Sequence, residues 1–160
     1  MKKYILILFA LTLIVSCSQV SSNTANGFGP RNFPITMGSQ SSVDVVIEMD
    51  KLWKESDFDG MREYISDSAR FVWEDGRTHN RDEFINSLKS DSLMYSWTFD
   101  WAFSVKDDNS EETNEWVNAG FNVVATNKSG DTLGGGHYNE WYLINKDGKI
   151  SFWFNTKANR

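Results

Sequence analysis

A large apolar residue occupies every second position from Tyr95 to Val105, and this alternation constrains the fold more than any other feature of the chain. Small or polar residues separate the large ones, which are Tyr95, Trp97, Phe99, Trp101, Phe103 and Val105. Because successive side chains of a β-strand point to opposite faces, the pattern predicts one strand with a strongly aromatic face. Such a face must be covered, and we expect helices from the preceding half of the chain to cover it.

The residues before this strand predict three helices and one short strand. Apolar residues at helical spacing predict an amphipathic helix from Ser42 to about Glu55, and a shorter stripe at 61–65 predicts a second helix. Asn80 and Glu83 have the spacing of a capping box, so a third helix is expected to begin there. The short strand is expected at 71–73.

Four strands are expected in an antiparallel meander, at residues 95–105, 115–126, 134–145 and 149–156. Asp147-Gly148 is typical of a two-residue hairpin turn, and a second turn is expected around Ser129-Gly130. The register set by the first turn pairs Glu140 with Asn155 and Ile144 with Ser151.

The two turns agree on which residues share a face of the sheet. One face carries Val117, Ala119, Phe121, Val123, Tyr138, Glu140, Tyr142, Ile144 and Trp153. The other carries Trp116, Asn118, Asn122, His137, Trp141, Leu143, Phe152 and Phe154. Both faces are too apolar to leave in water, and three helices cover only one, so we expect a homodimer across the other. The expected contact residues are Trp116, Trp141, Phe152 and Phe154.

The N-terminus has the form of an export signal. Lys2 and Lys3 precede an apolar run at 4–15, which is shorter than the roughly 20 residues of a membrane span. The run ends at Ser16-Cys17 and resembles a bacterial lipobox, which implies cleavage before Cys17 and lipid attachment to it. The alternative is an ordinary secretion signal with an unrelated cysteine.

This resemblance predicts a lipid-anchored protein of the bacterial cell envelope. Ser18 after the lipidated residue favours the outer membrane, facing the periplasm; the alternative is a secreted protein. The expected organisation is a signal peptide at 1–16, a flexible tether at 17–40 and one domain at 41–160.

Charge and composition exclude several classes of function. The formal net charge of −6, without a basic stripe, disfavours binding to nucleic acid. Cys17 is the single cysteine, so the chain has no disulfide framework and no thiolate zinc site. The two histidines, His79 and His137, fall on different predicted elements. We therefore expect neither a metal site nor a cofactor.

The order of elements resembles the nuclear transport factor 2-like superfamily, which includes SnoaL-like proteins and ketosteroid isomerases. The segments that carry the resemblance are 52–61, 65–69, 75–76 with 81–85, and 147–150. The resemblance implies an α+β cone, with three N-terminal helices packed on a strongly curved, mostly antiparallel sheet. It also implies a pocket between helices and sheet, and dimers across the outer sheet face.

The same resemblance allows the ketosteroid isomerase site to be compared position by position. The family's oxyanion tyrosine falls on Met49, its general-base aspartate on Trp73 and its second acid on Glu140. Steroid isomerisation needs a base and hydrogen-bond donors for the enolate, which Met and Trp do not supply. That reaction is therefore not expected here.

Glu140 is the strongest candidate for a functional residue, since a carboxyl group in apolar surroundings has a raised pKa and can exchange protons. The alternative is a structural Glu that is hydrated or paired with Asn155 or a Tyr hydroxyl. The predicted ligand-binding residues are Trp53, Tyr64, Trp73, Trp97, Trp101, Tyr138, Glu140, Tyr142, Trp153 and Asn155. Aromatic residues in such a set can equally form plain core.

The residues leave three hypotheses on function open. The first is an anchored protein that binds a small, partly apolar molecule in an aromatic pocket. The second is a SnoaL-like acid/base enzyme, of isomerase, cyclase or hydrolase type, that uses Glu140. The third is a non-catalytic association module.

Overall fold

The computed structural model describes residues 27, 29, 32–107 and 113–158. The predicted signal peptide and Cys17 lie outside the described residues. In chain order the elements are β1 (Ile35–Met37), α2 (Gln40–Lys54), the 3-10 helix η2 (Gly60–Tyr64), β2 (Ile65–Val72), β3 (Thr78–Asn80), α3 (Arg81–Ser90), β4 (Met94–Asp107), β5 (Glu115–Thr126), β6 (Thr132–Ile144) and β7 (Ile150–Ala158).

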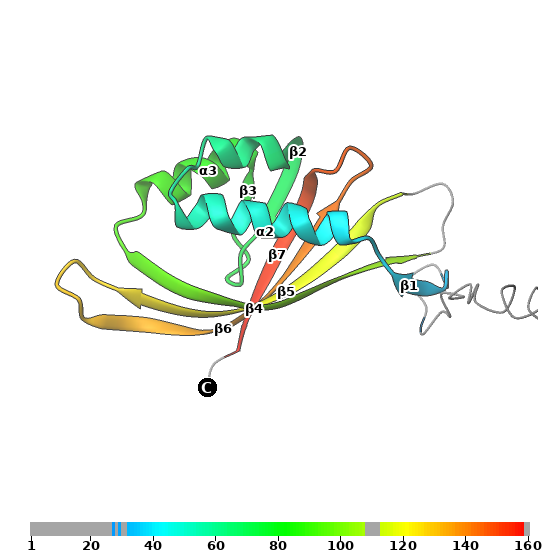
Figure 1. Ribbon diagram of the computed structural model, residues 1–160. Helices are drawn as coiled ribbons and strands as arrows, with labels where there is room; N and C mark the ends of the chain where they lie inside the picture. Colours follow the sequence, from blue (N-terminus) through cyan, green and yellow to red (C-terminus); the bar gives the residue numbers. More distant parts are fainter. Residues whose placement is uncertain (1–26, 28, 30–31, 108–112, 159–160) are drawn as a thin grey trace, which may run out of the picture.

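One seven-stranded sheet, in the order β1-β4-β5-β6-β7-β2-β3, forms the body of the α+β fold. The sheet is strongly curved, and both α-helices lie on its concave side (Figure 1). All strand pairs are antiparallel except β2 with β7, which is parallel. The predicted α+β class and the mostly antiparallel sheet are confirmed. None of the described helices is long and apolar enough to cross a membrane.

The prediction of three N-terminal helices is not confirmed. The apolar stripe at 61–65 belongs to η2 and to the start of β2 rather than to an α-helix. The Asp57 carboxylate accepts a hydrogen bond from the Gly60 backbone N–H at 2.9 Å and holds a tight turn there. Ile65 then enters the sheet by pairing in parallel with β7. Met61 and Ile65 are four residues apart, which is also the spacing of apolar residues on one face of a helix, so the sequence pattern predicted a helix here.

The segment predicted to be a tether, 17–40, includes ordered structure at its end. Ile35–Met37 forms β1 and pairs with residues 105–107 at the outer edge of β4. Ser39 is the N-cap of α2, which begins at Gln40. A three-residue strand is too short to show periodicity in the sequence, and the free backbone edge of β4 supplies its partner.

The expected registers of the last three strands are confirmed, with one exception. Phe121 faces Tyr138 and Ala119 faces Glu140 across β5 and β6, while Glu140 faces Asn155 across β6 and β7. Ile144 pairs with Ile150 rather than with Ser151, because the turn is a five-residue loop. The side-chain oxygen of Asn145 accepts hydrogen bonds inside this loop from the backbone N–H groups of residues 147 and 149, both at 3.0 Å.

A β-bulge at Asp100 interrupts the alternating strand of residues 95–105. Phe99 pairs with Phe121, but Trp101 pairs with the neighbouring residue, Gly120. One extra residue in one strand reverses the faces of all residues beyond it. Trp101 and Phe103 therefore lie on the outer face and are 45% and 39% exposed. The prediction that one face carries the whole aromatic series is wrong from Trp101 onward.

Candidate functional site

Glu140 lies in the middle of β6 and points toward the helices. Its exposed fraction is 9%, and two neighbouring side chains donate hydrogen bonds to a single carboxylate oxygen, Oε2. The Tyr142 hydroxyl is one donor, and Trp153 Nε1 is the other, at 3.0 Å. Within the described structure this leaves Oε1 as the oxygen available to a ligand.

Burial raises the pKa of the Glu140 carboxyl to about 7. The hydrogen bonds from Tyr142 and Trp153 favour the ionised form and oppose this rise, whereas the charges of Asp50 and Glu74 reinforce it. Burial also raises the pKa of the Tyr142 phenol well above its ordinary value, so Tyr142 stays a hydrogen-bond donor. Glu140 is thus balanced between its protonated and ionised forms near neutral pH.

Asn155 on β7 faces Glu140 directly across the strand pair. Its side chain is buried, and its amide oxygen Oδ1 accepts no hydrogen bond from any described residue. A buried polar atom without a partner costs about 1–3 kcal/mol. Among the described residues, Glu140 is hydrogen-bonded to the Tyr142 hydroxyl, one of the two partners considered above, and no hydrogen bond joins it to Asn155.

Aromatic rings surround this polar group on the helix side. Phe84 of α3 stacks on Phe71 at a centroid distance of 3.9 Å and lies 5.8 Å from Trp153. Trp73 lies 5.0 Å from Trp153, and Trp53 lies 5.5 Å from Phe84. Phe71, Phe84 and Trp153 are fully buried, so this part of the aromatic set is core.

Asp50 of α2 belongs to the same side of the sheet, and the sequence analysis missed it. Its carboxylate accepts a hydrogen bond from Trp97 Nε1 at 2.6 Å and binds the Lys54 ammonium at 2.8 Å. The available signal was an acidic residue within an apolar helical stripe, between Met49 and Trp53. Asp50 fixes the indole of Trp97 against the helix.

The structure brings most of the predicted ligand-binding residues to the inner side of the sheet, namely Trp53, Trp73, Trp97, Tyr138, Glu140, Tyr142, Trp153 and Asn155. Two predicted residues are elsewhere. Trp101 is on the outer face because of the bulge. Tyr64 ends η2 and does not pack against the buried core cluster.

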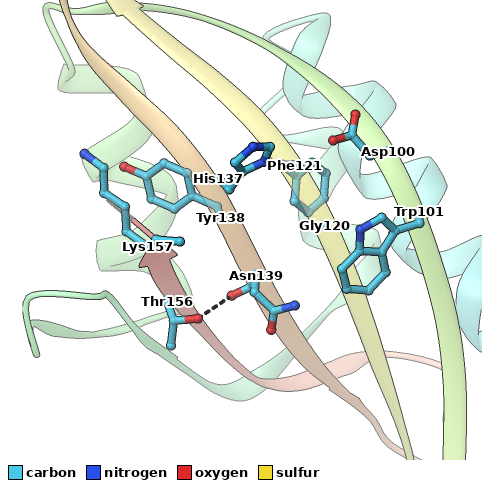
Figure 2. A pocket seen from close by; sticks show the side chains of 10 residues that line it. Asp100, Trp101, Gly120, Phe121, His137, Tyr138, Asn139, Thr156 and Lys157 are labelled. Carbon is cyan, nitrogen blue, oxygen red and sulfur yellow. Dashed lines mark hydrogen bonds between the residues drawn. The ribbon is translucent and has the colours of Figure 1, made fainter. Parts of the chain in front are cut away.

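Two surface pockets are centred away from Glu140. The larger, of about 350 Å³, is on the outer face, where Trp101, Gly120, His137 and Asn139 line it (Figure 2). The smaller, of about 250 Å³, adjoins the start of α2 near Ser39 and Lys146.

Within the part of the chain that the structure describes, no group of three or more His, Cys, Asp or Glu side chains is placed to hold a metal ion. His79 has a structural contact instead, since its Nδ1 accepts a hydrogen bond from Trp73 Nε1 at 3.0 Å. Around Glu140 the polar groups are its own carboxyl, the Tyr142 phenol and the Asn155 amide, with the Asp50 carboxylate on the helix side. Such a set can hold a hydroxyl or carbonyl group and exchange a proton with it.

No protein-family model matches the sequence, and a search of curated proteins found no relative. Solved structures are similar. A ketosteroid isomerase-like protein from Erwinia carotovora atroseptica has a TM-score of 0.58 at 12% identity, covering 75% of this chain and 95% of the other. An NTF2-like protein of unknown function from Cytophaga hutchinsonii has a TM-score of 0.55 at 14% identity, with coverages of 76% and 93%.

A third similar structure is a protein from Xanthomonas campestris pv. campestris that is provisionally named a polyketide cyclase. Its TM-score is 0.54 at 18% identity, with coverages of 74% and 91%. At such identities similarity shows the fold alone. The chain has the nuclear transport factor 2-like fold, as the order of its elements predicted.

Proposed function

We propose that the domain binds a small, partly apolar molecule on the inner side of its sheet, with Glu140 as the principal polar contact. This proposal rests on the buried Glu140 carboxyl. Tyr142 and Trp153 donate hydrogen bonds to its Oε2, and Oε1 remains available to a ligand. Burying a carboxyl group costs stability, so its retention among aromatic rings favours a role in function. The unpartnered Oδ1 of Asn155 adds an acceptor for a hydroxyl or amine donor on the same ligand.

Titration of the full chain with 2-naphthol, followed by the fluorescence of the probe, tests this proposal. The probe joins an aromatic body to one hydroxyl group. We expect saturable binding that strengthens as the pH rises through about 7, because an ionised carboxylate is the better acceptor.

Glu140→Gln should weaken binding about tenfold, because one charge-assisted hydrogen bond is lost. The matched control is Glu63→Gln, on the exposed surface of η2. Equal binding by all three chains contradicts the proposal.

A second candidate function is acid/base catalysis by Glu140, and its pKa of about 7 favours this candidate. Two of the similar structures carry isomerase-like or cyclase names. The probe reaction is exchange of the α-protons of 2-tetralone in heavy water, followed by proton NMR. An enzyme should lose about 100-fold or more of the exchange rate in Glu140→Gln while 2-tetralone still binds. Unchanged exchange would exclude this function for Glu140.

The third hypothesis, an association module, is supported by the aromatic residues on the outer face of the sheet. We also propose a homodimer across the outer face. Trp116 there lies 6.1 Å from Trp141, 6.0 Å from Phe152 and 6.4 Å from Phe154, so these residues form one aromatic patch. Contiguous apolar surface of this kind is typical of an interface.

Anchoring through a lipid on Cys17, in the outer membrane of a bacterial cell envelope, remains part of the proposal. Its support is the sequence, in which the single cysteine follows a short apolar run. Cys17→Ala should move the protein from the membrane fraction to the soluble fraction. A variant that still partitions with membranes would contradict lipid anchoring.

A further inference from the structure

The larger pocket on the outer face is built around one exposed indole. The bulge at Asp100 turns Trp101 outward, and Gly120 lies beneath it on β5 (Figure 2). A Cβ atom on Gly120 would lie 2.3 Å from Cε2 of the indole, so the ring lies against the bare backbone. Phe103 continues the aromatic surface along β4, with a centroid distance of 5.8 Å and an interplanar angle of 16° to Trp101. The result is a flat aromatic platform beside a groove.

Polar side chains flank this platform, and hydrogen bonds hold them in place. The Asp100 carboxylate accepts hydrogen bonds from the Thr98 hydroxyl at 2.7 Å and from Asn122 Nδ2. The amides of Asn139 and Asn118 bind each other through two hydrogen bonds of 2.9 and 3.3 Å. Because these groups are already fixed in the free protein, little conformational entropy is lost when they bind a ligand.

A flat ring beside fixed carboxylate and amide groups is suited to bind a sugar. A pyranose sugar has a face of C–H groups that packs on an indole, and a rim of hydroxyls that need both donors and acceptors. The volume of about 350 Å³ is near the lower end of the range for small-molecule sites, about 300–1,000 Å³. Lys157 also lines the groove, and its ammonium group lies over the Tyr138 ring, 5.6 Å from the ring centroid. The net charge of −6 and the Asp100 carboxylate oppose an anionic ligand.

We propose that this outer-face groove binds a neutral pyranose unit of an oligosaccharide, with Trp101 as the stacking platform and Asp100 and Asn139 as the hydroxyl-binding groups. The groove centres on the outward Trp101, whereas the Glu140 carboxyl lies on the inner face; Tyr138 is an inner-face residue that also lines the groove. Its occupancy does not depend on Glu140, so the two proposals fail or succeed independently. The groove adjoins the patch formed by Trp116, Trp141, Phe152 and Phe154, since Asn139 and Thr156 lie next to Trp141 and Phe154 on the same face of the sheet.

The test uses the full chain in a zwitterionic detergent, so that no detergent sugar competes. Maltotetraose, cellotetraose and N-acetylchitotetraose are the probes, titrated by calorimetry and by NMR of ¹⁵N-labelled indole groups. The chain has seven Trp, and the Trp101→Phe variant identifies the indole signal of Trp101.

We expect at least one probe to bind saturably and to shift the Trp101 signal more than any other indole signal. Trp101→Ala should weaken binding about tenfold or more, the loss typical of a removed Trp anchor. Trp101→Phe should retain part of the affinity.

Two further variants separate the groove from other surfaces. Asp100→Asn removes a carboxylate acceptor and should weaken binding several-fold. Tyr95→Ala, at a residue that is also 45% exposed but precedes the bulge on β4, should leave affinity unchanged. Failure of all three probes to bind by 10 mM overturns the proposal, as does equal affinity in Trp101→Ala. A Trp101 signal that shifts with protein concentration alone would assign the groove to a second copy of the chain and equally overturn it.

Discussion

At the scale of single residues, the buried Glu140 carboxyl makes stability depend on pH. Its folded-state pKa of about 7 lies above the ordinary value of 4.5. The folded state therefore retains a proton that the unfolded chain releases, and stability falls as the pH rises from about 4.5 to 7. From these two values the loss is about 3 kcal/mol.

Glu140→Gln should remove this contribution. We expect the free energy of unfolding of the wild type to fall by about 3 kcal/mol more than that of the variant between pH 4.5 and pH 8. Urea unfolding across that range measures it. The control is Glu63→Gln, which should follow the wild type. If the free energy of unfolding changes with pH in the same way for the wild type and Glu140→Gln, ionisation of the buried carboxyl does not destabilise the folded state, which would contradict the prediction.

The contact between Gly120 and Trp101 gives a second residue-scale prediction. In Gly120→Ala the new methyl group overlaps the indole, and because Trp101 is exposed and can move, we expect a loss of about 1 kcal/mol. The double variant with Trp101→Ala should recover it, since Ala is the better strand residue once the indole is gone. Urea unfolding of the four chains measures the coupling. An equal cost of Gly120→Ala in both backgrounds would contradict the outward placement of Trp101.

At the scale of elements, the N-terminus of α2 is held by a residue that is distant in the sequence, Glu115 of β5. Glu115 Oε2 accepts hydrogen bonds from the backbone N–H and the hydroxyl of Ser39, both at 2.7 Å. Partial burial raises the pKa of Glu115, but these hydrogen bonds outweigh it and lower the pKa overall. This stabilisation is present above about pH 4.5 and is lost as the pH falls through the lowered pKa.

Glu115→Gln should therefore destabilise the protein at pH 7 by about 1 kcal/mol, as expected for a lost charged partner at a helix cap. Amide hydrogen exchange should become faster in the first turn of α2, at residues 40–43, and stay unchanged in α3. The variant and the wild type should converge below the lowered pKa, where the wild-type carboxyl is protonated. A difference that persists once the wild-type carboxyl is protonated would exclude the ionic contribution.

The strand β4 shows why local pattern failed in one place. Alternation of apolar residues from Tyr95 to Val105 is perfect in the sequence, yet the structure divides it at Asp100. The side chains of Ala102 and Ser104 turn inward, toward β5 residues that are fully or almost fully buried, and the large rings turn outward. Alternation shows that the strand has two different faces. The position of a bulge depends on how the strand pairs with its neighbour, because two residues of one strand then lie opposite one residue of the other.

At the scale of the whole molecule, the outer face predicts the oligomeric state. We expect the full chain to sediment as a homodimer at micromolar concentration and Trp141→Lys to sediment as a monomer, because a charge within the aromatic patch prevents its burial. The control Leu133→Lys changes an apolar residue that is 57% exposed, near the turn between β5 and β6, and should remain a dimer. A wild-type chain that sediments as a monomer would contradict the proposed interface.

Much of the fold was predictable from sequence because its information is local. Helical spacing predicted α2, the capping box of Asn80 and Glu83 predicted the start of α3, and turn residues predicted the registers of β5, β6 and β7. The capping box is present with both of its hydrogen bonds, 2.9 and 3.0 Å long. β1 was not predictable, since it is held by the edge of a strand about 70 residues away.

The inner site divides in the same way. Turn chemistry and register suffice to place Glu140 on the same face as Tyr142 and opposite Asn155, because alternate residues of a strand share a face. Which donors reach Oε2, and that Asn155 keeps an unpartnered oxygen, depend on side-chain packing between strands and helices. The sequence determined the α+β class, the approximate starts of α2 and α3 and the pairing of β5, β6 and β7, all of which follow from short-range periodicity and turn chemistry. Tertiary structure alone decided the bulge, the outward Trp101 and the closed aromatic core, because each results from the fit between segments far apart in the chain.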